Sequence, residues 1–215
     1  MRILGVDEAG RGPVMGPMVL AGVLHTDQEV LRRLGVRDSK KLTPQRRMGL
    51  AEEIRSVAEC KERVVSAAEL DDAMGEASLN QLEARYFADI IRDLSPEEVY
   101  VDCCDTSPAR FERAILRHLG YDLSLRVEHG ADERYPIVSA ASIIAKVRRD
   151  EEMKRIGEEI GQPVGSGYAH DPQTLAFLKG WLKNHKEMPS HVRMSWRTSQ
   201  RLLSRARLRK LTEWD

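Results

Sequence analysis

Two adjacent carboxylates, Asp7 and Glu8, stand at the end of a short apolar run near the start of the chain. The run, Ile3 to Val6, is typical of a buried strand, and Gly10 and Gly12 open a turn directly after the acids. A carboxylate at the end of a buried strand loses hydration, which is unfavourable unless a cation or hydrogen bonds replace the water. This stretch therefore constrains the fold and predicts a site at the end of the first strand.

Two further aspartates have similar settings. Asp102 follows the apolar run 99–101, and Asp132 comes shortly after the strand-like segment 123–128. Oxygen ligands of this kind suit Mg²⁺ or Mn²⁺. The alternative is that all of them are ordinary surface acids among the 34 acidic residues of the chain, and the spacing alone leaves both readings open.

Strands and helices alternate irregularly along the chain, which favours a single α/β layer structure. A second apolar run, 17–24, lies too close to the first for a helical crossover, so we expect an antiparallel hairpin and a mixed central β-sheet flanked by helices. Other expected elements are helices that begin at Thr43, Ser78, Ser107 and Asp171, a long helix over 138–160, and strands over 63–67 and 123–128. We expect one main domain over 1–190 and a basic C-terminal helical extension over 191–215.

Composition limits the class of protein. The 215 residues are 41% hydrophobic and 32% charged, which allows a hydrophobic core, and no apolar run reaches membrane-spanning length. The first acids come too early for a signal peptide. Three cysteines, two of them adjacent, favour reduced thiols over disulfides. We therefore expect a cytoplasmic protein with no membrane partner.

The charge is unevenly distributed although the formal sum is zero. Residues 193–210 carry seven cations and no acid, so the rest of the chain carries −7. Arginines recur there at every fourth position and would form a stripe on a helix: Arg193, Arg197, Arg201 and Arg205. The stripe is either a solvated or body-clamping face or a contact for a nucleic acid backbone. We favour the second, because an acidic body that holds a polyanion needs such cations.

Four sequence blocks together resemble ribonuclease HII, and the third resembles its archaeal branch. They are Gly5 to Pro13, Asp38 to Leu42, Ala131-Asp132 with Tyr135 to Lys146, and Gly165 to Tyr168. The blocks occur in order and span most of the chain. The resemblance implies a ribonuclease H-like fold, and a metal-dependent endonuclease that hydrolyses the RNA strand of RNA–DNA hybrids. It also implies cutting on the 5′ side of ribonucleotides embedded in duplex DNA, which leaves 3′-hydroxyl and 5′-phosphate ends.

The resemblance assigns the catalytic and metal-ligating roles to Asp7, Glu8, Asp102 and Asp132. Two divalent ions, Mg²⁺ or Mn²⁺, are implied when substrate is bound. The chemistry supports this number independently. Phosphodiester hydrolysis needs an activated water and a stabilised leaving oxygen, and two cations about 3.5–4 Å apart serve both.

The resemblance also assigns substrate contacts. The turn Gly10-Arg11-Gly12 and Tyr168 would read the 2′-hydroxyl and the following deoxyribose, since glycine permits close backbone approach. Phosphate contacts are implied for Ser39, Lys40 and, by a weaker match, Asn80. No role is assigned to Cys103, Cys104, His129 and His170.

Two other functions compete with this interpretation. One is a non-catalytic nucleic acid-binding module that uses the basic tail, and retention of all four acids argues against it. The other is a ribonuclease HIII-like enzyme, which carries a domain ahead of its catalytic motif, whereas only six residues precede Asp7 here. We expect a monomer with RNA–DNA hybrid or ribonucleotide-containing DNA as its partner and no obligate protein partner.

Overall fold

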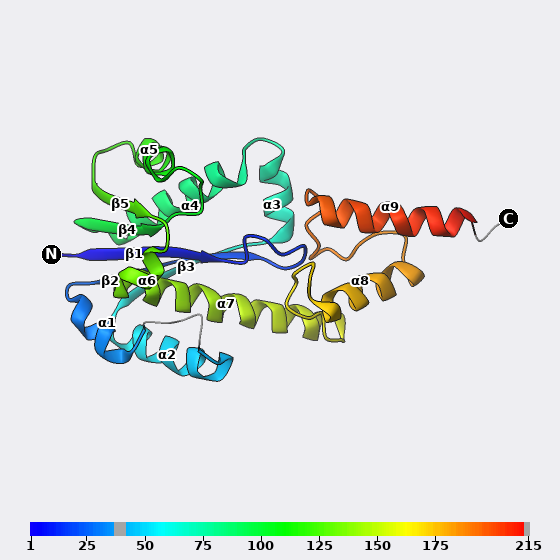
Figure 1. Ribbon diagram of the computed structural model, residues 1–215, viewed down its shortest axis with the longest axis horizontal. Helices are drawn as coiled ribbons and strands as arrows, with labels where there is room; N and C mark the ends of the chain where they lie inside the picture. The colour runs from blue at the N-terminus through cyan, green and yellow to red at the C-terminus, as the bar shows by residue number, and fades with distance from the viewer. Residues whose placement is uncertain (37–41, 213–215) are drawn as a thin grey trace. The chain divides into compact units, whose positions relative to one another are not determined.

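Five strands form one mixed β-sheet in the computed structural model, which describes residues 1–36 and 42–212, with side chains to residue 205 (Figure 1). The strand order is β3-β2-β1-β4-β5. The strands are β1 (Ile3–Ala9), β2 (Met18–His25), β3 (Glu59–Val65), β4 (Glu98–Asp102) and β5 (Ser124–Glu128). β2 pairs antiparallel with β1, whereas β4 pairs parallel with both β1 and β5. The expected hairpin and mixed sheet are confirmed.

Helices connect the strands and form the C-terminal part of the described chain. They are α1 (Gln28–Leu34), α2 (Pro44–Val57), α3 (Ala67–Met74), α4 (Leu79–Leu94), α5 (Pro108–Leu119), α6 (Ala131–Arg134), α7 (Pro136–Ile160), α8 (Pro172–Asn184) and α9 (Arg197–Thr212). Local sequence sets several of their ends. The Thr43 hydroxyl caps α2 with Pro44 at the first helical position, Ser78 and Gln81 form a capping box on α4, and Gly120 ends α5 in the left-handed conformation. These ends match the sequence prediction.

Several elements differ from expectation. β3 begins at Glu59 rather than at residue 63. Along this edge strand exposed charged residues alternate with half-buried ones, one of which, Glu62, is also charged, so the strand leaves little apolar signal. The short helices α1 and α3 were not predicted, since each provides barely two turns of periodicity. α7 begins at Pro136, where proline suits the first position of a helix.

The described chain divides into two compact units. Unit 1 comprises Met1–Ala9, Val19–Val64 and Ala77–Arg148, and unit 2 comprises Gly10–Met18, Val65–Glu76 and Arg149–Asp215. The predicted boundary at residue 190 lies inside unit 2. Both units are therefore assembled from segments far apart in the sequence.

Unit 1 is a sheet covered on both faces (Figure 1). Odd-numbered residues of β1, such as Ile3, pack with apolar residues of α1, α2 and α7, including Leu31, Ile54 and Ile137. On the opposite face Ile90 of α4 lies against Gly22 of β2. Because successive strand residues point to opposite faces, Asp7 shares the α7 face and Glu8 the α4 face.

Unit 2 has its own hydrophobic cluster. It joins Met15 of the Gly10–Met18 segment to Met153 of α7, Leu178 of α8 and Val192. An isolated antiparallel bridge pairs Met15 with Val192, and the Gly16 N–H donates to the His191 carbonyl at 2.8 Å. The residues after α8 thus hold the loop that follows β1.

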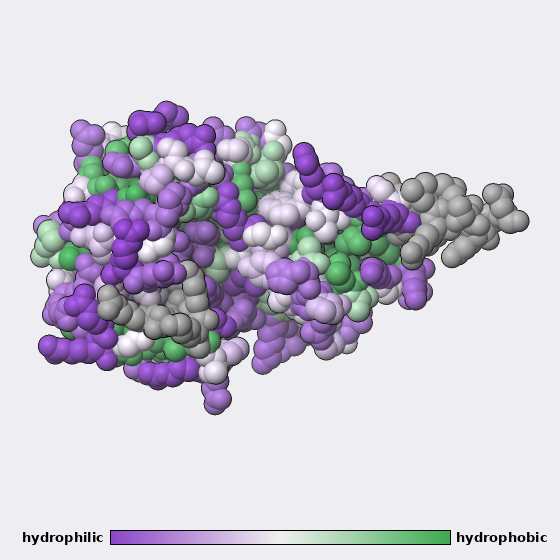
Figure 2. Space-filling view, viewed as in Figure 1, coloured by the Kyte–Doolittle hydropathy of each residue, from purple (hydrophilic) through white to green (hydrophobic). Residues whose placement is uncertain are grey.

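Hydrophilic residues cover much of the face shown in Figure 2, including the beginning of α9. Over the ranges that the structure describes, no helix combines the length and the apolar composition needed to cross a membrane.

A close approach of α7 to β1 yields a stability prediction. A Cβ atom at Gly5 would lie 2.4 Å from the Ile137 carbonyl carbon and oxygen. Since these are backbone atoms, the whole helix would have to move, and we expect Gly5→Ala to lower the free energy of unfolding by about 1–3 kcal/mol in urea denaturation. Gly49→Ala in α2 is the control and should be neutral or stabilising, because a Cβ atom at Gly49 would meet no heavy atom within 4 Å. An unchanged urea midpoint for Gly5→Ala would contradict this packing.

Candidate active site

Asp7 and Asp102 lie at the same edge of the sheet in unit 1. Asp7 is near the end of β1 and Asp102 is the last residue of β4, and the two strands pair in parallel, so their carboxyl ends meet. Asp7 is only 4% exposed. Parallel pairing therefore brings together two acids that are 95 residues apart in the sequence.

Burial, followed by the negative charge of Asp102, raises the pKa of Asp7 to about 7. A hydrogen bond from Ser142 and the positive charge of Lys146 act in the opposite direction. Lys146 in turn donates from Nζ to Ser142 Oγ at 2.6 Å, one turn apart on α7. A carboxylate in this setting is stabilised by a nearby cation, because both desolvation and its acidic neighbour disfavour its negative charge.

Asp102 also determines where Asp132 lies. Its Oδ1 accepts a hydrogen bond from the Ala131 N–H at 2.7 Å, and Ala131 is the first residue of α6. Asp132 follows directly and is 6% exposed. The structure thus connects the end of β4 to the acid that sequence spacing placed only loosely after the fifth strand.

Glu8 is half-buried and points to the opposite face from Asp7. Its negative charge also acts on Cys103, the residue after β4. Burial raises the pKa of the Cys103 thiol, and the charges of Asp102 and Glu8 raise it further. The Cys103 thiol contacts the Asp105 carbonyl at 3.2 Å, so it serves the turn after β4. All four predicted acids belong to unit 1.

The turn after β4 is held by a polar network around Asp105. Asn80 Nδ2 donates to Asp105 Oδ2 at 2.6 Å, and Arg110 Nε donates to the same oxygen at 3.1 Å. Arg110 and the other donors hold the pKa of Asp105 well below its usual range. Asn80, which was predicted as a substrate contact, is seen here to order the turn that follows Asp102. His129 Nδ1, in the segment between β5 and α6, lies 3.3 Å from the Cys103 carbonyl and so contacts this turn.

The donor set suits a hard divalent cation. Asp7 and Asp102 bring carboxylate oxygens to one sheet edge, and their mutual repulsion is the feature that a cation would relieve. Within the described residues, no group of three or more Asp, Glu, His or Cys side chains converges as a ready-made metal cage. The carboxylates of Asp7 and Asp102 are the kind of oxygen ligand that such a cation binds.

The predicted ribose reader lies in unit 2. Gly10 has a positive φ of 84°, and a Cβ there would lie 2.4 Å from Arg149 Nε, so only glycine fits this turn. Gly12 is exposed, and its Cβ position is 3.8 Å from the ring of Tyr168. The structure therefore brings the turn and Tyr168 together across more than 150 residues of sequence.

Arg149 and the loop before Tyr168 support the ring. The Arg149 guanidinium lies 5.1 Å from the Tyr168 ring centroid, and Nη2 donates to the Ser166 carbonyl at 2.6 Å. His170 stacks obliquely on Tyr168 at 5.2 Å between ring centroids. Sequence reasoning missed Arg149, because an arginine in the charged stretch that follows the apolar part of α7 gives no signal of burial.

Arg193 is a correction to the predicted basic stripe. Its side chain is fully buried, and its guanidinium donates to carbonyl oxygens of the Gly10–Gly16 loop rather than facing solvent. Burial, followed by the charge of Arg149, lowers the pKa of Arg193 to about 9. Arg193 is therefore unsuited to contact phosphate. The pattern misled because the spacing that gives a helical stripe extends four residues before the helix begins at Arg197.

The other predicted cations have different outcomes. Arg197, Arg201 and Arg205 are exposed on α9, one turn apart, as a backbone-binding face requires. Ser39 and Lys40 lie outside the described residues.

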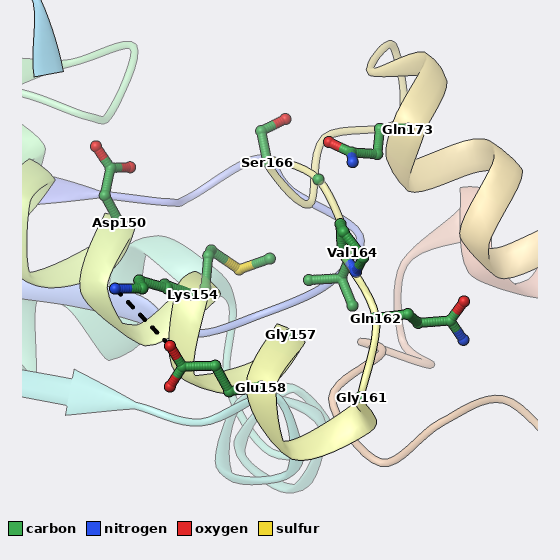
Figure 3. A pocket seen from close by; sticks show the side chains of 12 residues that line it. Asp150, Lys154, Gly157, Glu158, Gly161, Gln162, Val164, Ser166 and Gln173 are labelled. Atoms are coloured by element: carbon green, nitrogen blue, oxygen red, sulfur yellow. Dashed lines mark ion pairs between the residues drawn. The ribbon is translucent and has the colours of Figure 1, made fainter.

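A hollow of about 570 Å³ also lies in unit 2 (Figure 3). It is lined by α7, the 161–166 segment and Gln173. On its α7 side Lys154 forms an ion pair at 3.8 Å with Glu158, one helical turn further on. None of the predicted site residues lines it.

Comparisons with known proteins agree with this geometry. The family model described as Ribonuclease HII matches residues 4–199. A Ribonuclease HII from Archaeoglobus fulgidus is 47% identical over 198 residues, 92% of this chain and 95% of that protein. The crystal structure of ribonuclease H2 from Pyrococcus horikoshii OT3 aligns with a TM-score of 0.89 at 40% identity, over 96% of this chain and 99% of that one. The structure of the PCNA:RNase HII complex from Archaeoglobus fulgidus aligns with a TM-score of 0.86 at 46% identity, over 92% of this chain and 96% of that chain.

The mixed sheet, its flanking helices and the acids at its edge define a ribonuclease H-like nuclease. This class comprises hydrolases that depend on divalent metal ions. The chain belongs to the ribonuclease HII family, as the resemblance implied, and is an endonuclease. Neither a non-catalytic binding module nor a ribonuclease HIII-like enzyme is favoured.

Asp171 gives a pH-dependent prediction for unit 2. Its carboxylate caps α8 through the Gln173 N–H at 3.0 Å and accepts the Ser166 N–H at 2.6 Å. These bonds, with that from the Ser166 hydroxyl, lower the pKa of Asp171 to about 2. Because the folded-state pKa is depressed, the stabilisation is complete above the unfolded-state pKa of about 4 and is lost as the pH falls towards 2.

We expect Asp171→Ala to lower the free energy of unfolding by about 1 kcal/mol at pH 7, and the difference from the wild type to shrink as the pH is lowered to 2. Urea titrations at several pH values measure this. Glu187→Ala, an exposed acid in the same unit, is the control. A difference that stays constant down to pH 2 would show that the Asp171 bonds do not depend on its charge.

Proposed function

We propose that this chain hydrolyses the phosphodiester bond on the 5′ side of a ribonucleotide in RNA–DNA hybrids or in duplex DNA, leaving a 3′-hydroxyl and a 5′-phosphate. The observation that carries the proposal is the buried Asp7 beside Asp102 at the end of two parallel strands, inside a chain of the ribonuclease HII family. A water nucleophile leaves those ends, whereas attack by the ribonucleotide's own 2′-hydroxyl would break the bond on its 3′ side and leave a cyclic phosphate.

Two divalent ions, Mg²⁺ or Mn²⁺, would be held by Asp7, Glu8, Asp102 and Asp132. When bound with substrate, they supply an activated water and stabilise the leaving oxygen. The chain's own residues prepare this site. Ser142 and Lys146 restrain the Asp7 carboxylate on the α7 face, and the Asp102–Ala131 hydrogen bond fixes the start of the helix that carries Asp132.

Selection of the ribonucleotide would belong to Gly10, Arg11, Gly12 and Tyr168. The 2′-hydroxyl distinguishes RNA from DNA, and a turn without side chains at Gly10 and Gly12 lets backbone groups approach it. The half-buried Tyr168 ring would pack on the next deoxyribose, with Arg149 holding its position. Ser39, Lys40 and Asn80 are proposed as phosphate contacts.

The exposed face of α9 would add affinity that does not depend on sequence. Successive turns of α9 carry exposed arginines at positions 197, 201 and 205, and the first turn of this helix contains no acidic residue. Cations so spaced can follow a phosphate backbone.

Two expectations about context are revised or extended. The Archaeoglobus fulgidus relative has been solved in complex with PCNA, so we propose PCNA as a protein partner here too, in place of the expectation of none. Three free cysteines and a nucleic acid substrate support a cytoplasmic location.

Replacement of Asp102 tests the catalytic proposal. In Asp102→Asn the amide oxygen can still accept the Ala131 N–H, so the fold should persist while the negative charge is lost. We expect cleavage of a duplex with one embedded ribonucleotide to fall by about 100-fold or more in Mg²⁺ or Mn²⁺, since metal-assisted stabilisation is worth several kcal/mol. Asp122→Asn, an exposed residue before β5, is the control.

The same assay maps the product ends and includes an all-DNA duplex. Near-normal activity of Asp102→Asn would exclude its role as a ligand. Cyclic phosphate products, or equal cutting of the all-DNA duplex, would refute the proposed mechanism.

The α9 cations are tested by the triple change of Arg197, Arg201 and Arg205 to Gln. Each phosphate contact contributes about 0.9 to the slope of log affinity against log salt, so the slope should flatten by up to that amount for each arginine that binds a phosphate. Fluorescence anisotropy at several salt concentrations measures it. Lys179→Gln, an exposed cation on α8, should leave the slope unchanged. If the triple variant keeps the wild-type slope, the α9 face does not bind substrate.

A further inference from the structure

Arg193 occupies the interior of the loop that follows β1. Each of its three guanidinium nitrogens donates to a different carbonyl: Nε to Gly16 at 2.9 Å, Nη1 to Arg11 at 3.0 Å and Nη2 to Gly10 at 2.6 Å. The side chain is fully buried. An arginine is suited to this because its planar fork presents several donors at fixed angles, which a lysine cannot do.

The backbone around Arg193 is fixed as well. The Arg193 N–H donates to the Val14 carbonyl at 2.9 Å, and the guanidinium lies 4.9 Å from the ring centroid of Trp196. Asp71 accepts the N–H groups of Met194 at 2.6 Å and Ser195 at 2.9 Å. The donor fork therefore has a defined position within unit 2, and the carbonyls that it binds are oriented by it.

The direction of these carbonyls also fixes the direction of the N–H groups on the opposite side of the loop. No cis peptide bond occurs among the described residues, so each N–H points away from the carbonyl of the same peptide unit. The Gly10 and Arg11 carbonyls point at Arg193. The N–H groups of Arg11 and Gly12, which belong to those two peptide units, consequently point away from it.

We propose that Arg193 is a positioning residue for ribonucleotide selection: it holds the Gly10 and Arg11 carbonyls inward so that the Arg11 and Gly12 amides are presented to the 2′-hydroxyl. Two successive N–H groups that point the same way place two hydrogen-bond donors side by side, and a hydroxyl oxygen can accept a hydrogen bond from them. Gly12 is exposed and lies against Tyr168, so the presented edge is on the side of the proposed reader. The inference rests on the proposed function of that turn.

A purely structural role for Arg193 makes a different prediction. If Arg193 only stabilises unit 2, its loss should weaken folding and leave selectivity unchanged among molecules that remain folded. If it orients the two amides, its loss should reduce the preference for ribose over deoxyribose while affinity for plain DNA is retained.

The test compares binding of two duplexes that differ only in one 2′-hydroxyl, by fluorescence anisotropy in EDTA so that neither is cut. The ratio of the two Kd values is measured for the full wild-type chain, for Arg193→Met and Arg193→Lys, and for Leu178→Ala. Leu178 is a fully buried residue of the same unit and controls for lost stability. Circular dichroism establishes the temperature at which each variant is folded.

We expect Arg193→Met to reduce the wild-type preference by about tenfold or to unity, the effect of one net hydrogen bond, with the Kd for all-DNA duplex unchanged. Arg193→Lys should not restore the preference fully, and Leu178→Ala should keep the wild-type ratio despite lower stability. A folded Arg193→Met variant with the wild-type ratio would overturn the assignment of Arg193 alone. A wild-type chain that neither prefers nor cuts the ribonucleotide duplex would instead refute the proposed function. Cleavage without any binding preference would overturn the turn as reader and Arg193 with it.

A second measurement needs no variant and applies if the substitutions prevent folding. In the ¹⁵N-labelled wild-type chain, the amide resonances of Arg11 and Gly12 should differ between the complexes with the two duplexes. Identical shifts for both amides would overturn the proposal.

Discussion

A negative charge placed in a buried position beside another negative charge is unfavourable unless the protein arranges for a cation, and unit 1 is built around such a pair at Asp7 and Asp102. Parallel pairing of β1 with β4 makes the pair unavoidable, because both strands end at the same edge of the sheet. Ser142 and Lys146 of α7 partly offset this effect, because a hydrogen bond from Ser142 and the positive charge of Lys146 stabilise the charged Asp7 carboxylate. The residual repulsion between the two carboxylates is what a bound divalent cation would relieve.

This arrangement requires α7 to lie very close to β1. Gly5 leaves no room for a methyl group against the Ile137 backbone, so the glycine two residues before Asp7 sets the distance at which Ser142 can reach the carboxylate. The packing of β1 against α7 and the surroundings of the Asp7 carboxylate are thus coupled in one strand. A residue that looks like a simple break in an apolar run serves the position of the site.

Unit 2 places charge of the opposite sign in its interior. Arg149 and Arg193 are both buried, and each is stabilised by carbonyl oxygens and by an aromatic face, from Tyr168 and Trp196 respectively. Carbonyl dipoles accept hydrogen bonds without cancelling the net charge. Orientation of the glycine turn follows from this, since carbonyls drawn inward leave amides facing outward.

Local sequence determined much of this protein. The strand that ends in Asp7 and Glu8, the hairpin after it, and the caps at Thr43, Ser78 and Gly120 depend on neighbouring residues, and all could be predicted. The roles of the four acids and of the turn are predicted from the family blocks. Only the tertiary structure showed that Ser142 and Lys146 face Asp7, and that Arg193 is buried while Arg197 is exposed. The physical reason is that burial depends on partners distant in the chain: the Arg11 carbonyl that accepts from Arg193 is 182 residues away, and no spacing of arginines reveals it.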